Sequence, residues 1–246
     1  LGCHSARLKL CQVDLTSFAS IRKFVDHIKK EEKKVDILVN NAGVMLYPKF
    51  QLTTDGHELT WQTNYLGHFL LTELLEPLLE AASGGGRVVA VSALAHSYAD
   101  PLDLSAVDRR EAFDPRQAYA RSKAAQIMHA REWTRRLRLR GSAVCINACH
   151  PGLCFTRLVR HTPVATNAVL RLTLAPFAWY FLKTPKDGAQ TPLFLALSKS
   201  LDGVSGKYFS ELAEKEPSPS VFNDELCSQL YDYSRNACGL DPIASE

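Results

Sequence analysis

Apolar segments of strand length alternate with longer amphipathic segments along most of this chain, and this alternation constrains the fold more than any other feature. The clearest short segments are residues 35–39, 87–92 and 143–148, which consist largely of Val, Ile, Leu and Ala. Continuous apolar strands separated by helices are typical of a parallel sheet that is covered on both faces. The sequence therefore predicts an α/β fold with a doubly wound, mostly parallel sheet.

The expected elements follow one another as strand, helix and strand. Residues 17–32 are predicted to be a helix, because Ile21, Val25 and Ile28 recur at helical spacing. The expected strands are 8–15, 35–39, 87–92, 143–148 and 206–209, and the other expected helices lie within 54–81, 115–140 and 187–200, with a last helical patch near 226–233. Doubly wound sheets bind ligands at the carboxyl ends of their strands. Residues just after each strand are therefore the first candidates for a site.

Composition and charge exclude several classes of protein. The hydrophobic fraction of 46% and the charged fraction of 22% are those of a globular chain. A net charge of +3 is too small to indicate a nucleic-acid partner. The 7 cysteines include no Cys-x-x-Cys pair, so we expect reduced thiols and no metal site. The first ten residues do not resemble a secretory signal, and no apolar run is long enough to span a membrane.

Tyr119 and Lys123 form the most specific chemical pattern in the chain. Four residues apart on a predicted helix, they share one face. An ammonium group beside a phenol favours the phenolate, so we expect Lys123 to lower the pKa of Tyr119 below its usual value of ~10. Such a pair can act as acid and base at a carbonyl or an alcohol. Tyr and Lys also meet at this spacing by chance on surface helices.

Other polar or small residues follow the predicted strands in a regular order. They are Asp14 at the end of the first strand, Asn40, Asn41, Ala42 and Gly43 after the second, Asn64 in the next helix, and Pro151, Gly152 and Thr156 after a later strand. Each also has a purely structural interpretation, as a turn residue or as a helix-interior amide. Their joint occurrence at strand ends favours a binding site.

With these motifs the chain resembles the short-chain dehydrogenase/reductase family from about residue 8 to residue 209. The segments Asn-Asn-Ala-Gly-Val-Met at 40–45, Asn-Tyr-Leu-Gly-His-Phe-Leu-Leu-Thr at 64–72 and Gly-Ala-Gln-Thr-Pro at 188–192 are similar to its retinol dehydrogenase-like branch. The resemblance implies one Rossmann-like oxidoreductase domain over 1–246. Its core would lie at about 8–210, a substrate lid at about 157–186 and a C-terminal tail at about 211–246.

The same resemblance implies catalytic roles for three residues. Tyr119 would donate or accept the proton. Lys123 would lower the pKa of Tyr119 and hold the hydroxyls of the nicotinamide ribose. Asn64 would support a water-linked proton relay to Lys123.

The resemblance also implies a nicotinamide cofactor, expected to be NADP, with NAD as the alternative. Asp14 would contact its adenine side. Asn41, Ala42 and Gly43 would line the adenosine and ribose. Pro151, Gly152 and Thr156 would lie beside the nicotinamide.

Two departures from the family pattern bear on activity. The family begins with a strand, a Gly-rich turn and a helix that bind pyrophosphate, and no such turn opens this chain, so we expect it to be N-terminally truncated. The position of the family's catalytic serine is occupied by Ala93. Ser92 is the neighbouring candidate, but adjacent side chains on a strand point to opposite faces. A bulge at the strand end would be needed to turn Ser92 towards the site.

Residues 158–182 are rich in Leu, Phe, Trp and Tyr and match the family's substrate-binding region. A helix packed on the domain is one interpretation, and a hydrophobic substrate pocket or a membrane-surface lid is the other. We therefore expect interconversion of a hydrophobic alcohol and its aldehyde or ketone, a retinoid or another lipid. Homo-oligomers and a location in the cytoplasm or on the cytosolic face of the endoplasmic reticulum would fit the family. The alternative is a catalytically impaired member that acts by binding.

Overall fold

A single five-stranded sheet organises the protein in the computed structural model, which describes residues 8–152 and 183–240. The strands lie in sequence order: β1 (Ile37–Asn40), β2 (Arg87–Val91), β3 (Cys145–His150), β4 (Tyr208–Ser210) and β5 (Ala213–Glu214). The first four are parallel, and β5 pairs antiparallel with β4. The predicted mostly parallel α/β sheet is confirmed.

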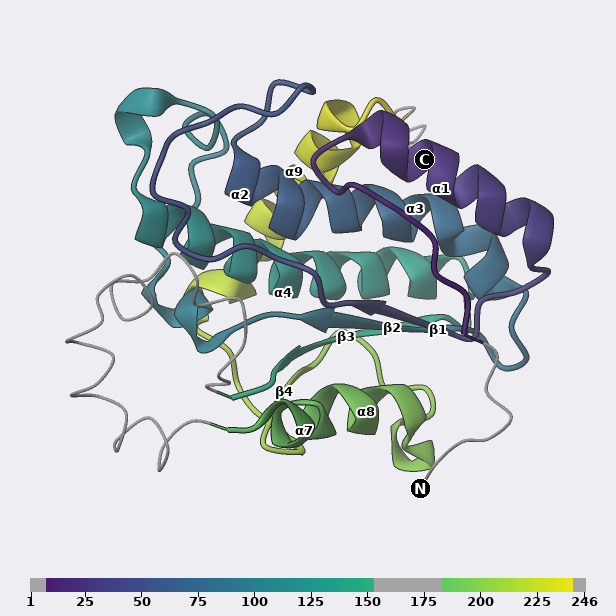
Figure 1. The fold of residues 1–246 in the computed structure, drawn as a ribbon. Helices are drawn as coiled ribbons and strands as arrows, with labels where there is room; N and C mark the ends of the chain where they lie inside the picture. Colours follow the sequence, from purple (N-terminus) through teal and green to yellow (C-terminus); the bar gives the residue numbers. More distant parts are fainter. Residues whose placement is uncertain (1–7, 153–182, 241–246) are drawn as a thin grey trace.

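Helices cover both faces of the sheet, as Figure 1 shows. One face carries α1 (Phe18–Glu31), α2 (Leu59–Trp61), the π-helix η1 (Gln62–Leu66), α3 (Gly67–Glu80), α4 (Pro115–Leu139) and α9 (Asp224–Ala237). The other carries α7 (Pro185–Gly188) and α8 (Gln190–Leu197). Short 3-10 helices η2 (Leu94–Tyr98), η3 (Arg110–Ala112), η5 (Lys199–Leu201) and η6 (Pro219–Phe222) lie between them in the chain. Among the described residues, no helix is long and apolar enough to cross a membrane.

The alternation of side chains along the strands builds two cores. Val88, Ala90, Ile146 and Ala148 belong to the larger core, together with residues of α1, α3, α4 and α9. Val89, Val91 and Cys149 belong to a smaller core with Leu195 of α8 and Phe209 of β4. Because both faces of β2 and β3 are buried, these strands consist of continuous apolar residues.

The helix α4 carries the Tyr119/Lys123 pair, and its ends follow from local chemistry. The Asp114 side chain accepts hydrogen bonds from the backbone N–H groups of Arg116 and Gln117, and Pro115 occupies the first helical position. At the other end, Gly141 adopts a positive φ of 69°, which a helix-ending residue requires and glycine provides without strain. The predicted helix 115–140 is confirmed almost to the residue.

The predicted strand at 8–15 is wrong. These residues have irregular backbone and pair with no strand among the described residues, and Leu8 and Leu10 are almost fully exposed. The alternation of Leu and Val suits a strand, but a strand also needs a neighbour for its backbone N–H and C=O groups. Asp14 therefore precedes the first helix rather than ending a strand.

Other predicted bounds differ in detail. The predicted helix 187–200 is divided into α7, α8 and η5, and the helix within 54–81 contains the π-helix η1. The C-terminal helix α9 is longer than the predicted patch and adds Cys227, Leu230 and Tyr231 to the larger core. Thr156 and all but the last four residues of the predicted lid at 157–186 lie outside the described residues.

Candidate active site

Most of the described candidate site residues lie near the carboxyl ends of β1, β2 and β3, under helices η1 and α4. Asn41, Ala42 and Gly43 follow β1, Ser92 follows β2, and Pro151 and Gly152 follow β3. The ends of β2 and β3 are joined by a hydrogen bond from the Ser92 N–H to the Cys149 carbonyl, 2.8 Å long. This is the edge at which parallel sheets bind ligands.

Asn64 is fully buried in the π-helix η1 and ties this helix to the loop after β1. Its side-chain oxygen accepts the Val44 N–H at 2.8 Å, and its Nδ2 donates to the Val44 carbonyl at 2.9 Å and to Ser122 Oγ at 3.0 Å. All the polar atoms of the amide side chain are therefore engaged with protein. Single π-turns inside helices occur frequently at functional sites, and this one places Asn64 against α4.

Gly43 lies where the loop after β1 passes closest to the buried polar groups. A Cβ atom at this position would lie 2.9 Å from Asn64 Oδ1 and 3.9 Å from Lys123 Nζ. A contact of 2.9 Å is too short for a carbon atom, so a side chain here would displace Asn64. The predicted residues Gly43, Asn64 and Lys123 are thus brought together.

The ammonium group of Lys123 is buried, and the two oxygens that accept its hydrogen bonds in the described part of the chain are both neutral. Its Nζ donates to the Val91 carbonyl at 2.7 Å and to Gln126 Oε1 at 3.2 Å. Burial lowers the pKa of Lys123 to about 8, and the nearby Cys149 opposes this shift. Lys123 is therefore still mainly charged at neutral pH.

The expected lowering of the Tyr119 pKa is wrong for this arrangement. Tyr119 is 6% exposed, and burial raises its pKa to about 12. Lys123 Nζ lies 5.8 Å from the centre of the Tyr119 ring and directs hydrogen bonds to Val91 and Gln126. Burial of the phenol therefore raises the pKa of Tyr119 more than the Lys123 ammonium group on the same helix face lowers it.

Ser92 is buried, and its hydroxyl is committed to the backbone. Its Oγ donates to the Lys123 carbonyl at 2.7 Å, which directs the side chain towards the body of α4. Ala93 is extended, with φ −152° and ψ 160°, so its side chain points to the opposite side. A hydroxyl at position 93 would therefore point away from the place that Ser92 occupies.

The residues predicted to contact the adenosine and the nicotinamide of the cofactor form no hydrogen-bonded cluster like that of Asn64 and Lys123 among the described residues. Asp14 Oδ1 accepts from the N–H and the hydroxyl of Thr16, a local turn that precedes α1. Asn41 and Ala42 are exposed at the end of β1. Gly152 has a φ of 89°, and a Cβ atom there would meet the Lys183 side chain at 2.7 Å.

Two polar residues at this site were not predicted. Gln126 is buried one turn after Lys123, and its Nε2 donates to the Asn64 carbonyl at 2.7 Å. His68 Nδ1 donates to the same carbonyl at 3.0 Å, and burial lowers the pKa of His68 to about 4. The available signal was spacing: Gln126 follows Tyr119 by seven residues and Lys123 by three, which puts all three on one helix face.

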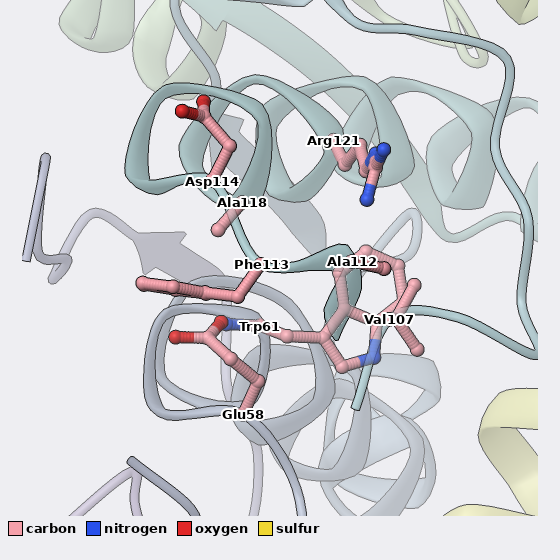
Figure 2. A pocket seen from close by; sticks show the side chains of 8 residues that line it. All are labelled: Glu58, Trp61, Val107, Ala112, Phe113, Asp114, Ala118 and Arg121. Carbon is pink, nitrogen blue, oxygen red and sulfur yellow. The ribbon is translucent and has the colours of Figure 1, made fainter. Parts of the chain in front are cut away.

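A small cavity lies beside this region, at the start of α4 (Figure 2). Its volume is about 10 Å³, room for about one water molecule. Figure 2 shows its lining of Glu58, Trp61, Val107, Ala112, Phe113, Asp114, Ala118 and Arg121. None of the predicted catalytic residues lines it. Within residues 8–152 and 183–240, no group of three His, Cys, Asp or Glu side chains could hold a metal ion.

Comparisons with known proteins agree with this geometry. A family model described as short chain dehydrogenase matches residues 1–165. Retinol dehydrogenase 13 of Mus musculus is 42% identical over 235 residues, which cover 95% of this chain and 69% of that protein. Polyprenol dehydrogenase of Mus musculus is 38% identical over 230 residues, 92% of this chain and 67% of that protein. A crystal structure of a protein from Mycobacterium paratuberculosis has 30% identity and a TM-score of 0.72, over 95% of this chain and 76% of that one.

Proposed function

Because the chain belongs to the short-chain dehydrogenase family of oxidoreductases, we propose that it interconverts a hydrophobic alcohol and its aldehyde or ketone with NADP as cofactor. In this proposal Tyr119 is the acid and base at the substrate oxygen. Lys123 and Asn64 hold the surrounding polar network. Ser92 has no direct part, because its hydroxyl proton is directed to the Lys123 carbonyl.

One observation carries the proposal: Gly43 and Asn64 come from distant parts of the sequence and converge on Lys123, whose ammonium group lies 5.8 Å from the centre of the Tyr119 ring. Asn64 Oδ1 and Lys123 Nζ both lie within 4 Å of the space beside Gly43. A chance Tyr–Lys pair on a surface helix would be exposed, whereas Tyr119 and Lys123 are 6% and 4% exposed. Burial of a titratable pair at the carboxyl edge of a sheet is typical of a catalytic site.

Gly43 and Lys123 suit contact with the ribose and nicotinamide of such a cofactor. Gly43 lets the loop after β1 approach Asn64 and Lys123 closely, and two of the three ammonium hydrogens of Lys123 are accounted for by Val91 and Gln126. The remaining N–H suits a ribose hydroxyl. We assign Asp14, Asn41 and Ala42 to the adenosine side, and Pro151, Gly152 and Thr156 to the nicotinamide side, on the family pattern.

The chemistry of the protein groups favours reduction of a carbonyl. A bound nicotinamide supplies or accepts the hydride. Tyr119, with a pKa near 12, keeps its phenolic proton at neutral pH and is suited to donate it to the oxygen of a carbonyl substrate. The buried Lys123 ammonium stabilises negative charge that develops on the Tyr119 oxygen after the transfer.

The hydrophobic substrate is inferred from two relatives. One is a retinol dehydrogenase and the other a polyprenol dehydrogenase, and both names denote long lipid alcohols. Substrates of this kind partition into membranes, so association with a membrane surface and a location on the cytosolic face of the endoplasmic reticulum belong to the same proposal. Homo-oligomer formation is a further part of it, carried over from the family.

Thermal unfolding of the purified chain with NADPH or NADH tests cofactor binding. A ligand specific for the folded state and present at about 100 times its Kd stabilises by about 2.7 kcal/mol. For a domain of this size, that corresponds to a rise in Tm of roughly 5–10 °C. We expect this rise with NADPH and a smaller one with NADH. No rise with either nucleotide contradicts the assignment of a cofactor site to this chain.

Turnover then tests the substrate class separately. We expect NADPH-dependent reduction of all-trans-retinal to be faster than reduction of a small polar aldehyde such as glyceraldehyde. Equal turnover of the two carbonyl compounds contradicts the hydrophobic substrate.

A catalytically impaired protein that acts by binding is the second candidate, and Ala93 favours it. Loss of one oxyanion-type hydrogen-bond donor lowers kcat about 10²–10³-fold. If the rest of the site is intact, Ala93→Ser is expected to raise kcat by about the same factor. Ala95→Ser is the matched control, because Ala95 lies two residues further and is also half-buried. No gain with Ala93→Ser supports the binding role.

A further inference from the structure

Gln126 connects two polar groups of the proposed site. Its amide is 3% exposed. Nε2 donates to the Asn64 carbonyl at 2.7 Å, and Oε1 accepts from Lys123 Nζ at 3.2 Å. One side chain on α4 therefore connects η1 to the ammonium group of Lys123.

The bridge leaves no vacant lone pair on the Asn64 carbonyl. A backbone carbonyl oxygen has two lone pairs, and this one accepts both Gln126 Nε2 and His68 Nδ1. A water molecule bound there would have to displace one of these donors. Gln126 is thus held at both ends of its amide, by the Asn64 carbonyl and by Lys123.

The bridge also determines which oxygen the ammonium group meets. Lys123 Nζ has the Val91 carbonyl and Gln126 Oε1 as acceptors, and both are neutral. Within residues 8–152 and 183–240, the titratable groups that face Lys123 are Tyr119 on α4, His68 on α3 and Cys149 in β3. None of these carries a negative charge at neutral pH, so a neutral acceptor from Gln126 is a large part of the solvation of this buried cation.

We propose that Gln126 is a positioning residue of the oxidoreductase site, which is anchored on the Asn64 carbonyl and holds the Lys123 ammonium group. That Gln126 serves catalysis rests on the proposed function. That the Gln126 side chain controls the charge on Lys123 can be tested without turnover.

Titration of the Lys123 side chain in the cofactor-free chain tests this content. Lys123 is followed by NMR of its ε-methylene group and assigned with Lys123→Arg. Gln126→Glu places a carboxylate at the acceptor position and is expected to raise the pKa of Lys123 by about one pH unit or more. Gln126→Met has a similar shape without the acceptor and is expected to lower it. Gln229→Glu on the exposed face of α9 adds the same charge elsewhere and should leave it unchanged.

The pH dependence of kcat provides the second readout. The fall in activity at high pH, expected as Lys123 loses its proton, should move to higher pH in Gln126→Glu and to lower pH in Gln126→Met. A side chain with a merely structural role would lower Tm in both variants without shifts in opposite directions. Equal Lys123 pKa values in the native chain and both Gln126 variants overturn the inference. If the pKa of Lys123 shifts as expected in both Gln126 variants but the native chain has no turnover, the proposed function is contradicted, whereas the role of Gln126 at Lys123 stands.

Discussion

Replacing Tyr119 with phenylalanine is expected to lower kcat by about 10²–10⁴-fold, the usual contribution of general acid–base catalysis. Phenylalanine keeps the buried ring, so the Tm and the NADPH-induced rise in Tm should remain close to those of the native chain. The loss would then reflect the missing phenolic proton rather than a damaged fold. Single-turnover oxidation of NADPH with retinal measures it directly.

Tyr65→Phe is the matched control for this experiment. Tyr65 is also buried, and its hydroxyl forms a 2.7 Å hydrogen bond with Ser234 of α9. Removing this hydroxyl should cost about 1 kcal/mol of stability, the typical value for one hydrogen bond, and leave kcat nearly unchanged. Retained turnover in Tyr119→Phe would refute the role of Tyr119 as the acid and base.

Acid is expected to destabilise the protein strongly below pH 6.5 because two neutral histidines are buried on adjacent helices. Burial lowers the pKa of His68 to about 4 and that of His129 to about 3, compared with about 6.5 in an unfolded chain. Between these values the unfolded state binds more protons than the folded state. Stability is therefore complete above pH 6.5 and is lost as the pH falls. At pH 4 each histidine removes about 3 kcal/mol.

His129→Phe separates this effect from the rest of the acid response. His129 packs against Phe69, Tyr65, Trp133 and Tyr231, and its buried Nε2 finds no hydrogen-bond partner in the described part of the chain. Phenylalanine should fit this aromatic cluster and reduce the loss between pH 6.5 and pH 4 by about 3 kcal/mol, as measured by urea unfolding. His27→Gln, on the exposed side of α1, should leave the pH dependence unchanged. An unaltered pH dependence in His129→Phe would contradict the prediction.

The elements predicted best are those whose limits are set by nearby residues. Asp114 and Pro115 begin α4, and Ser17 caps α1 through the Ser20 N–H. The central strands were predicted because burial on both faces requires apolar residues at every position. The segment 8–15 has a similar alternation, but its conformation depends on a neighbouring strand, which local sequence does not specify.

The proposed catalytic residues were selected from residue types and spacing, which did not predict their electrostatics. Spacing places Lys123 on the same helix face as Tyr119, and yet the pKa of Tyr119 rises because the phenol is buried. Burial and the direction of the Lys123 side chain arise from long-range packing. The same holds for Gln126, because its partner Asn64 lies 62 residues earlier in a separate helix and only the fold brings the two together.

The π-helix η1 has a consequence for insertions and deletions in this gene. The Gly67 N–H bonds to the Gln62 carbonyl five residues earlier, so this turn contains one residue more than a turn of α-helix. Deletion of one codon within 62–66 would allow a continuous α-helix to form. Because the deleted residue is the extra one, the helical segments on both sides would keep their buried faces, and the change of about 100° per residue would be confined to the turn itself. Such a chain would still form a helix, but the position that Asn64 occupies against Val44 and Ser122 would be lost, so this deletion should damage the site more than the fold.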